Sequence, residues 1–227
     1  MAQTAPGHLR FAVVAVDAAI FTFLNEQLCV LLMPINLPPH YPNSQGLPGG
    51  IIKPQETTEE AVERVLAEKV ALSADHLEQL ATFSRVDRDK RNRVVSVGYL
   101  GFVRPEEAQK YQVDREKPGY FLPVREVGTL AYDHNEMLDA ARARLIGKLA
   151  YTTIAQFLLP KHFTLTELQV VYEVVQKTTY DKRNFRKKIL ALDIVKETGR
   201  MQEGVKNRPA ALYQFNSNQL STLPLVV

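Results

Sequence analysis

The chain of 227 residues lacks the features that mark membrane and secreted proteins. No apolar run reaches the roughly 18 residues that a membrane-spanning helix needs. The N-terminal segment does not show the charged-then-apolar order of a secretory signal. The single cysteine, Cys29, cannot form a disulfide within the chain. We therefore expect a cytoplasmic protein with no membrane partner.

Common catalytic and metal-binding patterns are also scarce. The five histidines show no metal-ligand spacing, and no Ser-His-Asp or cysteine-based arrangement can be read. Tyr132, Asp133 and His134 form the only suggestive trio, for which a helix start capped by Asp133 is the simpler interpretation. The sequence contains no internal repeat and no low-complexity tract, which excludes the repeat architectures.

The composition is ordinary, but the charge is unevenly distributed. Hydrophobic residues make up 45% and charged residues 23%, as in a typical globular chain. The net charge is +3, yet residues 151–227 contain 11 lysines and arginines against six acidic residues. A basic C-terminal third indicates either a polyanionic partner or a merely solvated surface.

The first 160 residues read as strands combined with helices. Strand-like runs, rich in β-branched and aromatic residues, occupy 11–23, 28–33, 94–103 and 120–124. The first two runs are separated by three polar residues and predict a hairpin. Proline and glycine mark 36–50 as a loop. A helical pattern runs from 135 to 159, where Pro160 closes it.

Residues 50–72 carry a recognisable spacing. Thr57-x-x-Glu60 is a capping box, which predicts a helix that starts just after Glu56. The on-pattern residues are Gly50, Glu56, Arg64, Leu66, Glu68 and Leu72. The stretch resembles the Nudix box, whose helix uses clustered carboxylates to hold Mg²⁺ against a diphosphate. Two carboxylate positions are occupied by Val65 and Lys69, so we expect no metal, no catalysis and a pocket that still binds a nucleoside diphosphate.

Several of these side chains have two interpretations. Arg64 and Glu68 are four apart and suit a helix-face ion pair, while the Nudix resemblance implies that Arg64 and Glu56 brace the loop against the helix. Lys69 either contacts a bound diphosphate or is solvated. The cluster at 85–93 contains five cations, which suit a phosphate clamp, but its two aspartates also suit a solvated turn with internal pairs.

The C-terminal residues follow the order of a winged helix-turn-helix. A capping box at Thr164 begins one helix, Asp181 caps a second, basic helix, and a ribbon with a basic tip follows. The alternative is an ordinary basic amphipathic helix, which does not explain that order. The residues expected to contact DNA are Lys182, Arg183, Asn184, Arg186 and Lys187 in the helix and Lys206, Asn207 and Arg208 at the tip.

At this point the chain resembles the NrtR-type Nudix-related transcriptional regulators. The matching stretches are 47–50, the box through Leu72, 87–100, Asp133-His134, 163–173, 181–188 and 207–215. The resemblance implies an α+β chain, with a Nudix-like α/β/α sandwich at 1–150 and a winged helix-turn-helix domain at 151–227. It further implies a homodimeric repressor of NAD biosynthesis or salvage genes, which binds a palindromic double-stranded operator.

The resemblance also implies a small-molecule effector, ADP-ribose, that releases the DNA, and no cofactor. The residues expected to bind the effector are Gly50, Glu56, Arg64, Glu68, Lys69, Arg88 and Arg91. Two alternatives remain: a related regulator with a sugar effector, and a weak Nudix pyrophosphatase whose C-terminal domain serves dimerisation or substrate specificity. RNA binding has no support beyond charge.

Overall fold

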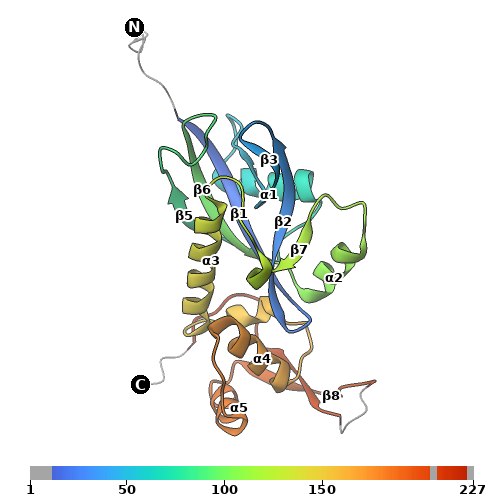
Figure 1. Ribbon diagram of the computed structural model, residues 1–227. Helices are drawn as coiled ribbons and strands as arrows, with labels where there is room; N and C mark the ends of the chain where they lie inside the picture. Colours follow the sequence, from blue (N-terminus) through green and yellow to red (C-terminus); the bar gives the residue numbers. More distant parts are fainter. Residues whose placement is uncertain (1–11, 205–208, 224–227) are drawn as a thin grey trace.

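A mixed seven-stranded sheet forms the centre of the first domain in the computed structural model, which describes residues 12–204 and 209–223 (Figure 1). Its strands are β1 (Val13–Leu24), β2 (Gln27–Leu37), β3 (Tyr41–Gly46), β4 (Gly49–Ile51), β5 (His76–Phe83), β6 (Val94–Phe102) and β7 (Tyr120–Pro123). The main path runs β3-β2-β1-β6-β5, with β4 paired to β1 and β7 paired to β2. Strands β1 and β6 run parallel, and the other pairs are antiparallel.

The predicted hairpin is confirmed, whereas the predicted loop is wrong. Strands β1 and β2 are joined at Asn25 and Glu26, which both have positive φ (49° and 57°) as a tight two-residue hairpin requires. Within 36–50, however, the chain forms β3 and begins β4. A strand at the end of the sheet tolerates the proline at position 42, because one row of its backbone N–H groups has no ladder partner to lose.

Helices cover both faces of this sheet. Alternate residues of β1 point to opposite faces, so that Val16 and Ile20 pack with α1 (Thr58–Val70) and α2 (Pro105–Val113), while Ala19 and Phe21 pack with α3 (His134–Leu149). The α1 start follows the predicted capping box. This arrangement confirms the Nudix-like α/β/α sandwich.

The single helix predicted over 135–159 is divided in two. α3 ends at Leu149, and a short 3-10 helix, η2, spans Ile154–Leu158. Between them the Thr152 hydroxyl donates to the Lys148 carbonyl at 2.7 Å, and the backbone N–H of Thr153 donates to the Ser221 carbonyl at 2.9 Å. Pairing with the C-terminal segment thus takes the backbone groups that a continuing helix would use.

The second domain has the predicted winged-helix order. It contains α4 (Leu165–Gln176), α5 (Lys182–Ala191), β8 (Val195–Met201) and β9 (Ala211–Phe215), and Phe163 pairs with Tyr213 beside the ribbon. Its core is continuous with one face of the large sheet, since Phe102, Phe157 and Leu168 belong to the same buried cluster. The expected boundary at 150/151 is not tested by this and stays a prediction. Within the described residues, no helix is long and apolar enough to cross a membrane.

Candidate functional site

Arg64 joins α1 to the loop that precedes it. Its Nε lies 2.5 Å from Glu56 Oε1, and its Nη2 donates to Glu56 Oε2 at 2.9 Å and to the Ile51 carbonyl at 3.0 Å. The hydrogen bonds from Arg64 lower the pKa of Glu56 to about 2. Arg64 also reaches Glu68 at 3.3 Å, but Glu68 is 57% exposed, so this second pair adds little. Both interpretations of Arg64 are therefore present, and the brace dominates.

The two altered positions of the box have structural partners of their own. Val65 is fully buried, and a Cβ on Gly50 would lie 2.9 Å from its Cγ2. The Lys69 ammonium donates to the Gly49 carbonyl at 2.6 Å. An apolar side chain and a cation thus stand where a Nudix helix presents carboxylates. Within the described part of the chain, no group of three or more His, Cys, Asp or Glu side chains is placed to hold a metal ion.

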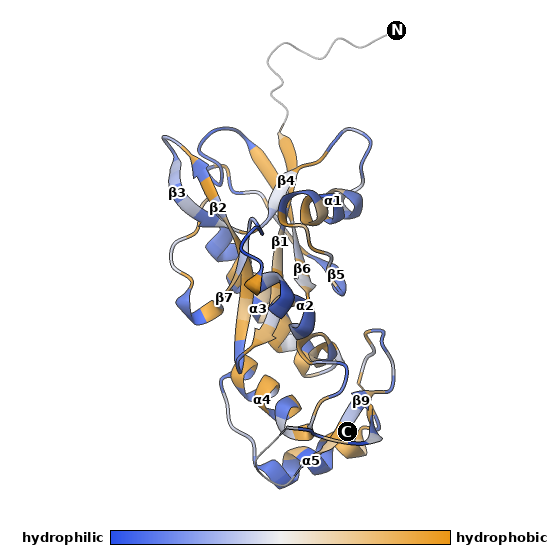
Figure 2. Ribbon diagram, turned by 90° about the vertical axis from the view of Figure 1, so that its right-hand side faces the viewer, coloured by the Kyte–Doolittle hydropathy of each residue, from blue (hydrophilic) through white to orange (hydrophobic). Residues whose placement is uncertain are grey.

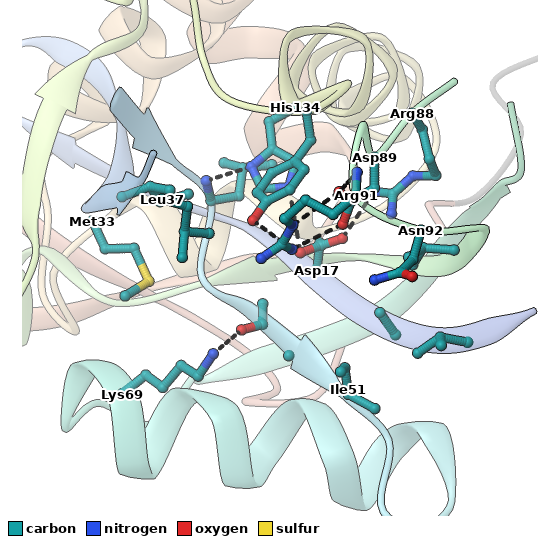
Figure 3. A pocket seen from close by; sticks show the side chains of 18 of the residues that line it. Asp17, Met33, Leu37, Ile51, Lys69, Arg88, Asp89, Arg91, Asn92 and His134 are labelled. Atoms are coloured by element: carbon teal, nitrogen blue, oxygen red, sulfur yellow. Dashed lines mark hydrogen bonds and ion pairs between the residues drawn. The ribbon is translucent and has the colours of Figure 1, made fainter. Parts of the chain in front are cut away.

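A cavity of about 550 Å³ opens above this loop, between the sheet and the 88–92 segment (Figure 3). This volume lies within the range of pockets that hold drug-sized ligands. One wall is apolar and includes Val13, Met33, Ile35, Leu37, Ile51 and Val94. The remaining lining is polar and includes Asp17, Lys69, Arg88, Asp89, Arg91, Asn92, Tyr132 and His134. The cavity can therefore accept a ligand with one apolar, planar part and one anionic part.

A buried charge network forms the floor of this cavity. The Arg88 side chain is 3% exposed and binds Asp133 through two hydrogen bonds, of 2.9 and 2.8 Å. Its Nη2 also donates to Asp17 at 3.2 Å, and the Ser96 hydroxyl donates to Asp17 at 2.6 Å. Burial raises the pKa of Asp17, but His134, Ser96 and Arg88 outweigh burial and hold that pKa below its ordinary value. Three hydrogen bonds from Arg88 therefore go to two carboxylates, those of Asp133 and Asp17.

His134 connects the floor to the neighbouring loop. Its Nδ1 accepts the Leu47 backbone N–H at 2.9 Å, which places the proton on Nε2, 3.4 Å from Asp17. A Cβ on Gly49 would lie 1.7 Å from the Asp17 carboxylate, so the loop approaches the network only because residue 49 is glycine. Asp133 occupies the N-cap position of α3, but its carboxylate binds Arg88, so the interpretation of Asp133 as a side-chain cap is wrong.

The turn at 85–93 forms the internal pairs of one interpretation, while the phosphate clamp stays a prediction. Arg91 pairs with Asp89 at 2.9 Å and Arg85 with Asp87 at 2.8 Å, as the solvated-turn alternative requires. Arg91 nevertheless lines the cavity, where its Nη2 donates to the Tyr132 hydroxyl at 3.1 Å. Its side chain is 39% exposed, in contrast to buried Arg88. Of the two arginines, Arg91 is therefore the one that a ligand can reach.

Four of the seven residues expected to bind the effector line the cavity. These are Gly50, Lys69, Arg88 and Arg91. Glu56, Arg64 and Glu68 lie beside the cavity and form the brace described above. The sequence reasoning overlooked Asp17, although a lone charge within an apolar strand is a signal that sequence offers. It also overlooked the apolar wall, because alternating strand residues look the same whether they face a core or a cavity.

The second domain presents a basic helix. In α5, Phe185 and Ile189 are buried, while the side chains expected to contact DNA lie on the remaining faces. Lys182, Arg183, Asn184 and Lys187 are exposed. Arg186 is half-buried and donates to the Thr166 hydroxyl at 3.1 Å, which ties α5 to α4. Figure 2 shows α5 at the end of the molecule, largely hydrophilic. Lys206, Asn207 and Arg208 lie outside the described residues.

The fold and the two sites define a class of regulator in which a Nudix domain is joined to a winged-helix DNA-binding domain. The NUDIX domain family matches residues 13–143, and the NrtR DNA-binding winged helix domain matches residues 155–215. The chain belongs to the NrtR family of Nudix-related transcriptional regulators.

Two relatives, one of them represented by two solved structures, illustrate this membership. The ADPR responsive transcriptional repressor NtrR of Acinetobacter baylyi is 32% identical over 206 residues, which cover 88% of this chain and 80% of the relative. Shewanella oneidensis NrtR, solved with a 27mer DNA, has 34% identity, a TM-score of 0.77 and coverage of 89% and 93%. The NUDIX domain of the same protein, solved with ADP ribose, has 32% identity, a TM-score of 0.51 and coverage of 63% and 94%.

Proposed function

We propose that this chain is a transcriptional repressor that releases its operator DNA when ADP-ribose occupies the cavity of the Nudix domain. One observation carries the proposal. The first domain holds a Nudix-type cavity without the metal-holding carboxylates, and it shares a buried core with a winged helix whose α5 exposes cations. The relatives support it, since one is named as an ADPR responsive repressor and another was solved with DNA.

The cavity suits the two chemical parts of ADP-ribose. An adenine ring fits the apolar wall formed by residues such as Met33 and Ile35, and a diphosphate fits the side that carries Lys69 and Arg91. To bind the diphosphate, Lys69 exchanges its 2.6 Å hydrogen bond to Gly49, and Arg91 exchanges part of its pairing with Asp89. Arg88 holds the floor in place. The relative's NUDIX domain solved with ADP ribose supports ADP-ribose as the ligand.

The same geometry supports binding without hydrolysis. Metal-assisted cleavage of a diphosphate needs carboxylates to hold Mg²⁺. Val65 is buried in the core and Lys69 places a positive charge at the helix face, which repels the ion. We therefore assign the domain an effector-sensing role and not an enzymatic one. Mg²⁺-dependent release of AMP from ADP-ribose would favour the alternative, a weak pyrophosphatase.

For DNA we propose that α5 enters the major groove. All four side chains concerned are exposed; Arg183 and Asn184 would read bases, while Lys182 and Lys187 would meet phosphates. A two-fold dimer would present two such helices to half-sites about one helical turn apart, which matches a palindromic operator. The dimer and its control of NAD-related genes stay predictions.

The test is fluorescence anisotropy of the gene's own upstream DNA, titrated with protein in the presence and absence of ADP-ribose. We expect tight, salt-sensitive binding that ADP-ribose reverses. The Arg183→Ala variant should lose specific binding, whereas Lys110→Ala, an exposed cation of the first domain, should bind as the unaltered protein does. DNA binding that ADP-ribose leaves unchanged would refute ADP-ribose as the effector, and sugars would be tested next. Absence of DNA binding would refute the proposal that the chain acts as a transcriptional repressor at this site.

A further inference from the structure

A second polar cavity, of about 410 Å³, lies where the first domain meets the ribbon of the winged helix. It is lined by residues from the loop after β6, the segment that leads into α4, the two strands of the ribbon and the stretch that follows β9. Its lining comprises Arg104, Gln156, Pro160, Lys161, His162, Arg200, Gln214, Phe215, Asn216 and Asn218. Among the residues that the structure describes, the lining holds three cations and no carboxylate. Such a lining favours an anion.

Arg104 is held in a fixed orientation at this cavity. Its guanidinium donates to the Gln156 carbonyl at 3.1 Å, lies 3.3 Å from Asp75 and packs 5.8 Å above the Phe157 ring. One element of the site is therefore already oriented by the junction between the domains. A pre-oriented guanidinium loses less conformational entropy when it binds a tetrahedral anion.

Lys161 and Arg200 supply charge that is not neutralised locally. Within the described residues, neither side chain has a carboxylate within 4.0 Å, whereas Arg104 does. The carboxylate of Glu106 lies near Lys161, where it accepts the backbone N–H at 3.2 Å. The side chains of Lys161 and Arg200 are exposed and belong to different elements. An anion between them would therefore bridge the segment before α4 and the ribbon.

The site is separate from the two sites described above. The ribbon contributes Arg200 from β8 and Gln214 and Phe215 from β9 to its lining. The described residues of α5 are absent from the lining. The cavity is thus separate from the recognition helix, and it is also separate from the effector cavity.

We propose that this junction cavity binds a phosphate-type anion, with Arg104, Lys161 and Arg200 as its charged ligands. Guanidinium groups bind phosphate oxygens through paired hydrogen bonds, and the amides of Gln214 and Asn218 supply further donors. The bound anion ties the first domain to the ribbon and so fixes the direction of the wing. It is either the phosphate of a small molecule or a backbone phosphate of DNA.

The first arm of the experiment measures a free anion. The full chain is titrated calorimetrically with sodium pyrophosphate, against sodium chloride at matched ionic strength. The Lys69→Ala/Arg91→Ala variant removes the two cations that the effector cavity offers to a diphosphate. In that background we expect the remaining binding to weaken at least tenfold in Lys161→Ala/Arg200→Ala, and to persist in the matched control Lys196→Ala, an exposed cation of β8 that lies outside the cavity.

The second arm measures DNA. If the phosphate belongs to DNA, Arg200→Ala lowers the slope of log binding constant against log salt by about one, the value for one lost phosphate contact. Pyrophosphate binding that depends on Lys161 and Arg200 identifies a small-molecule source, and a changed salt slope without such binding identifies DNA. The proposal is overturned if the salt slope is unchanged and pyrophosphate either does not bind or binds equally well to the Lys161→Ala/Arg200→Ala variant.

Discussion

Replacement of Arg88 by methionine tests the buried network at the floor of the effector cavity. The substitution keeps much of the side chain's volume but removes three hydrogen bonds, two to Asp133 and one to Asp17. Asp133, whose side chain is 3% exposed, then loses its guanidinium partner, while Asp17 keeps Ser96 and His134. Loss of one member of a buried ion pair costs about 3–5 kcal/mol. We expect a loss of that size in the free energy of unfolding.

The measurement is urea-induced unfolding followed by circular dichroism, since the chain contains no tryptophan for fluorescence. Asp133→Leu and the double variant Arg88→Met/Asp133→Leu complete a double-mutant cycle. The double variant should be more stable than the sum of the single losses predicts, because it leaves only Asp17 without the arginine. The matched control is Arg85→Met, an exposed arginine of the same turn whose partners Asp87 and Glu136 are exposed as well, for which we expect a loss below about 1 kcal/mol.

A loss below about 1 kcal/mol for Arg88→Met would refute this reasoning. It would mean that Asp133 and Asp17 become protonated or hydrated at little cost in free energy, and therefore that solvent reaches the floor of the cavity. Additive losses in the double variant would also count against the network, because they would show that Arg88 and Asp133 act independently.

Three further predictions concern other parts of the chain. The pKa of Glu56, about 2, lies below the ordinary value of 4.5. Its ion pair therefore stabilises the fold above about pH 4.5 and is lost as the pH falls toward 2, so Glu56→Gln should flatten this acid-side decline in Tm. Val65→Glu with Lys69→Glu should lower Tm by burying a carboxylate, and Mg²⁺ should recover part of the loss; no response to Mg²⁺ would contradict this. Phe185→Ala, at a side chain packed on two tyrosines, should cost about 3–5 kcal/mol and abolish DNA binding while ADP-ribose binding persists.

The elements predicted correctly from sequence carry their signals locally. The helices α1 and α4 each begin at a capping box, and both boxes form as the sequence indicates. The β1–β2 hairpin is likewise set by two strand-like runs and the turn between them. The strands β3 and β5 were not predicted, because strands at the ends of a sheet are defined by pairing more than by composition. The short helix α2 buries only Pro105, Ala108 and Tyr111, which is too little to show a period.

The site was harder to predict than the fold, because its contacts join distant parts of the sequence. The cations of the 85–93 turn were visible, but their roles depend on partners: Arg91 pairs with a neighbour two residues away, while Arg88 pairs with Asp133, 45 residues away, and Asp17, 71 residues away. Spacing within the turn cannot separate the two arginines. Only the folded chain shows that one is buried and the other lies at the mouth of the cavity.

Helix α3 is one of the elements that connect the effector cavity to the winged helix, beside β1, which contacts η2, and β2, which contacts α4. It begins with Asp133 and His134 at the floor of the cavity, extends 16 residues or about 24 Å, and packs against η2 and α4 at its other end. An effector changes DNA affinity only by binding two arrangements of the domains unequally. The charges at the floor of the cavity are buried and already paired. A ligand that alters their pairing therefore moves the start of α3, and not merely a flexible side chain at the surface. The buried face of the helix, with Met137, Leu145 and Leu149, lies in the core shared with the DNA-binding domain, where close packing favours transmission of such a shift.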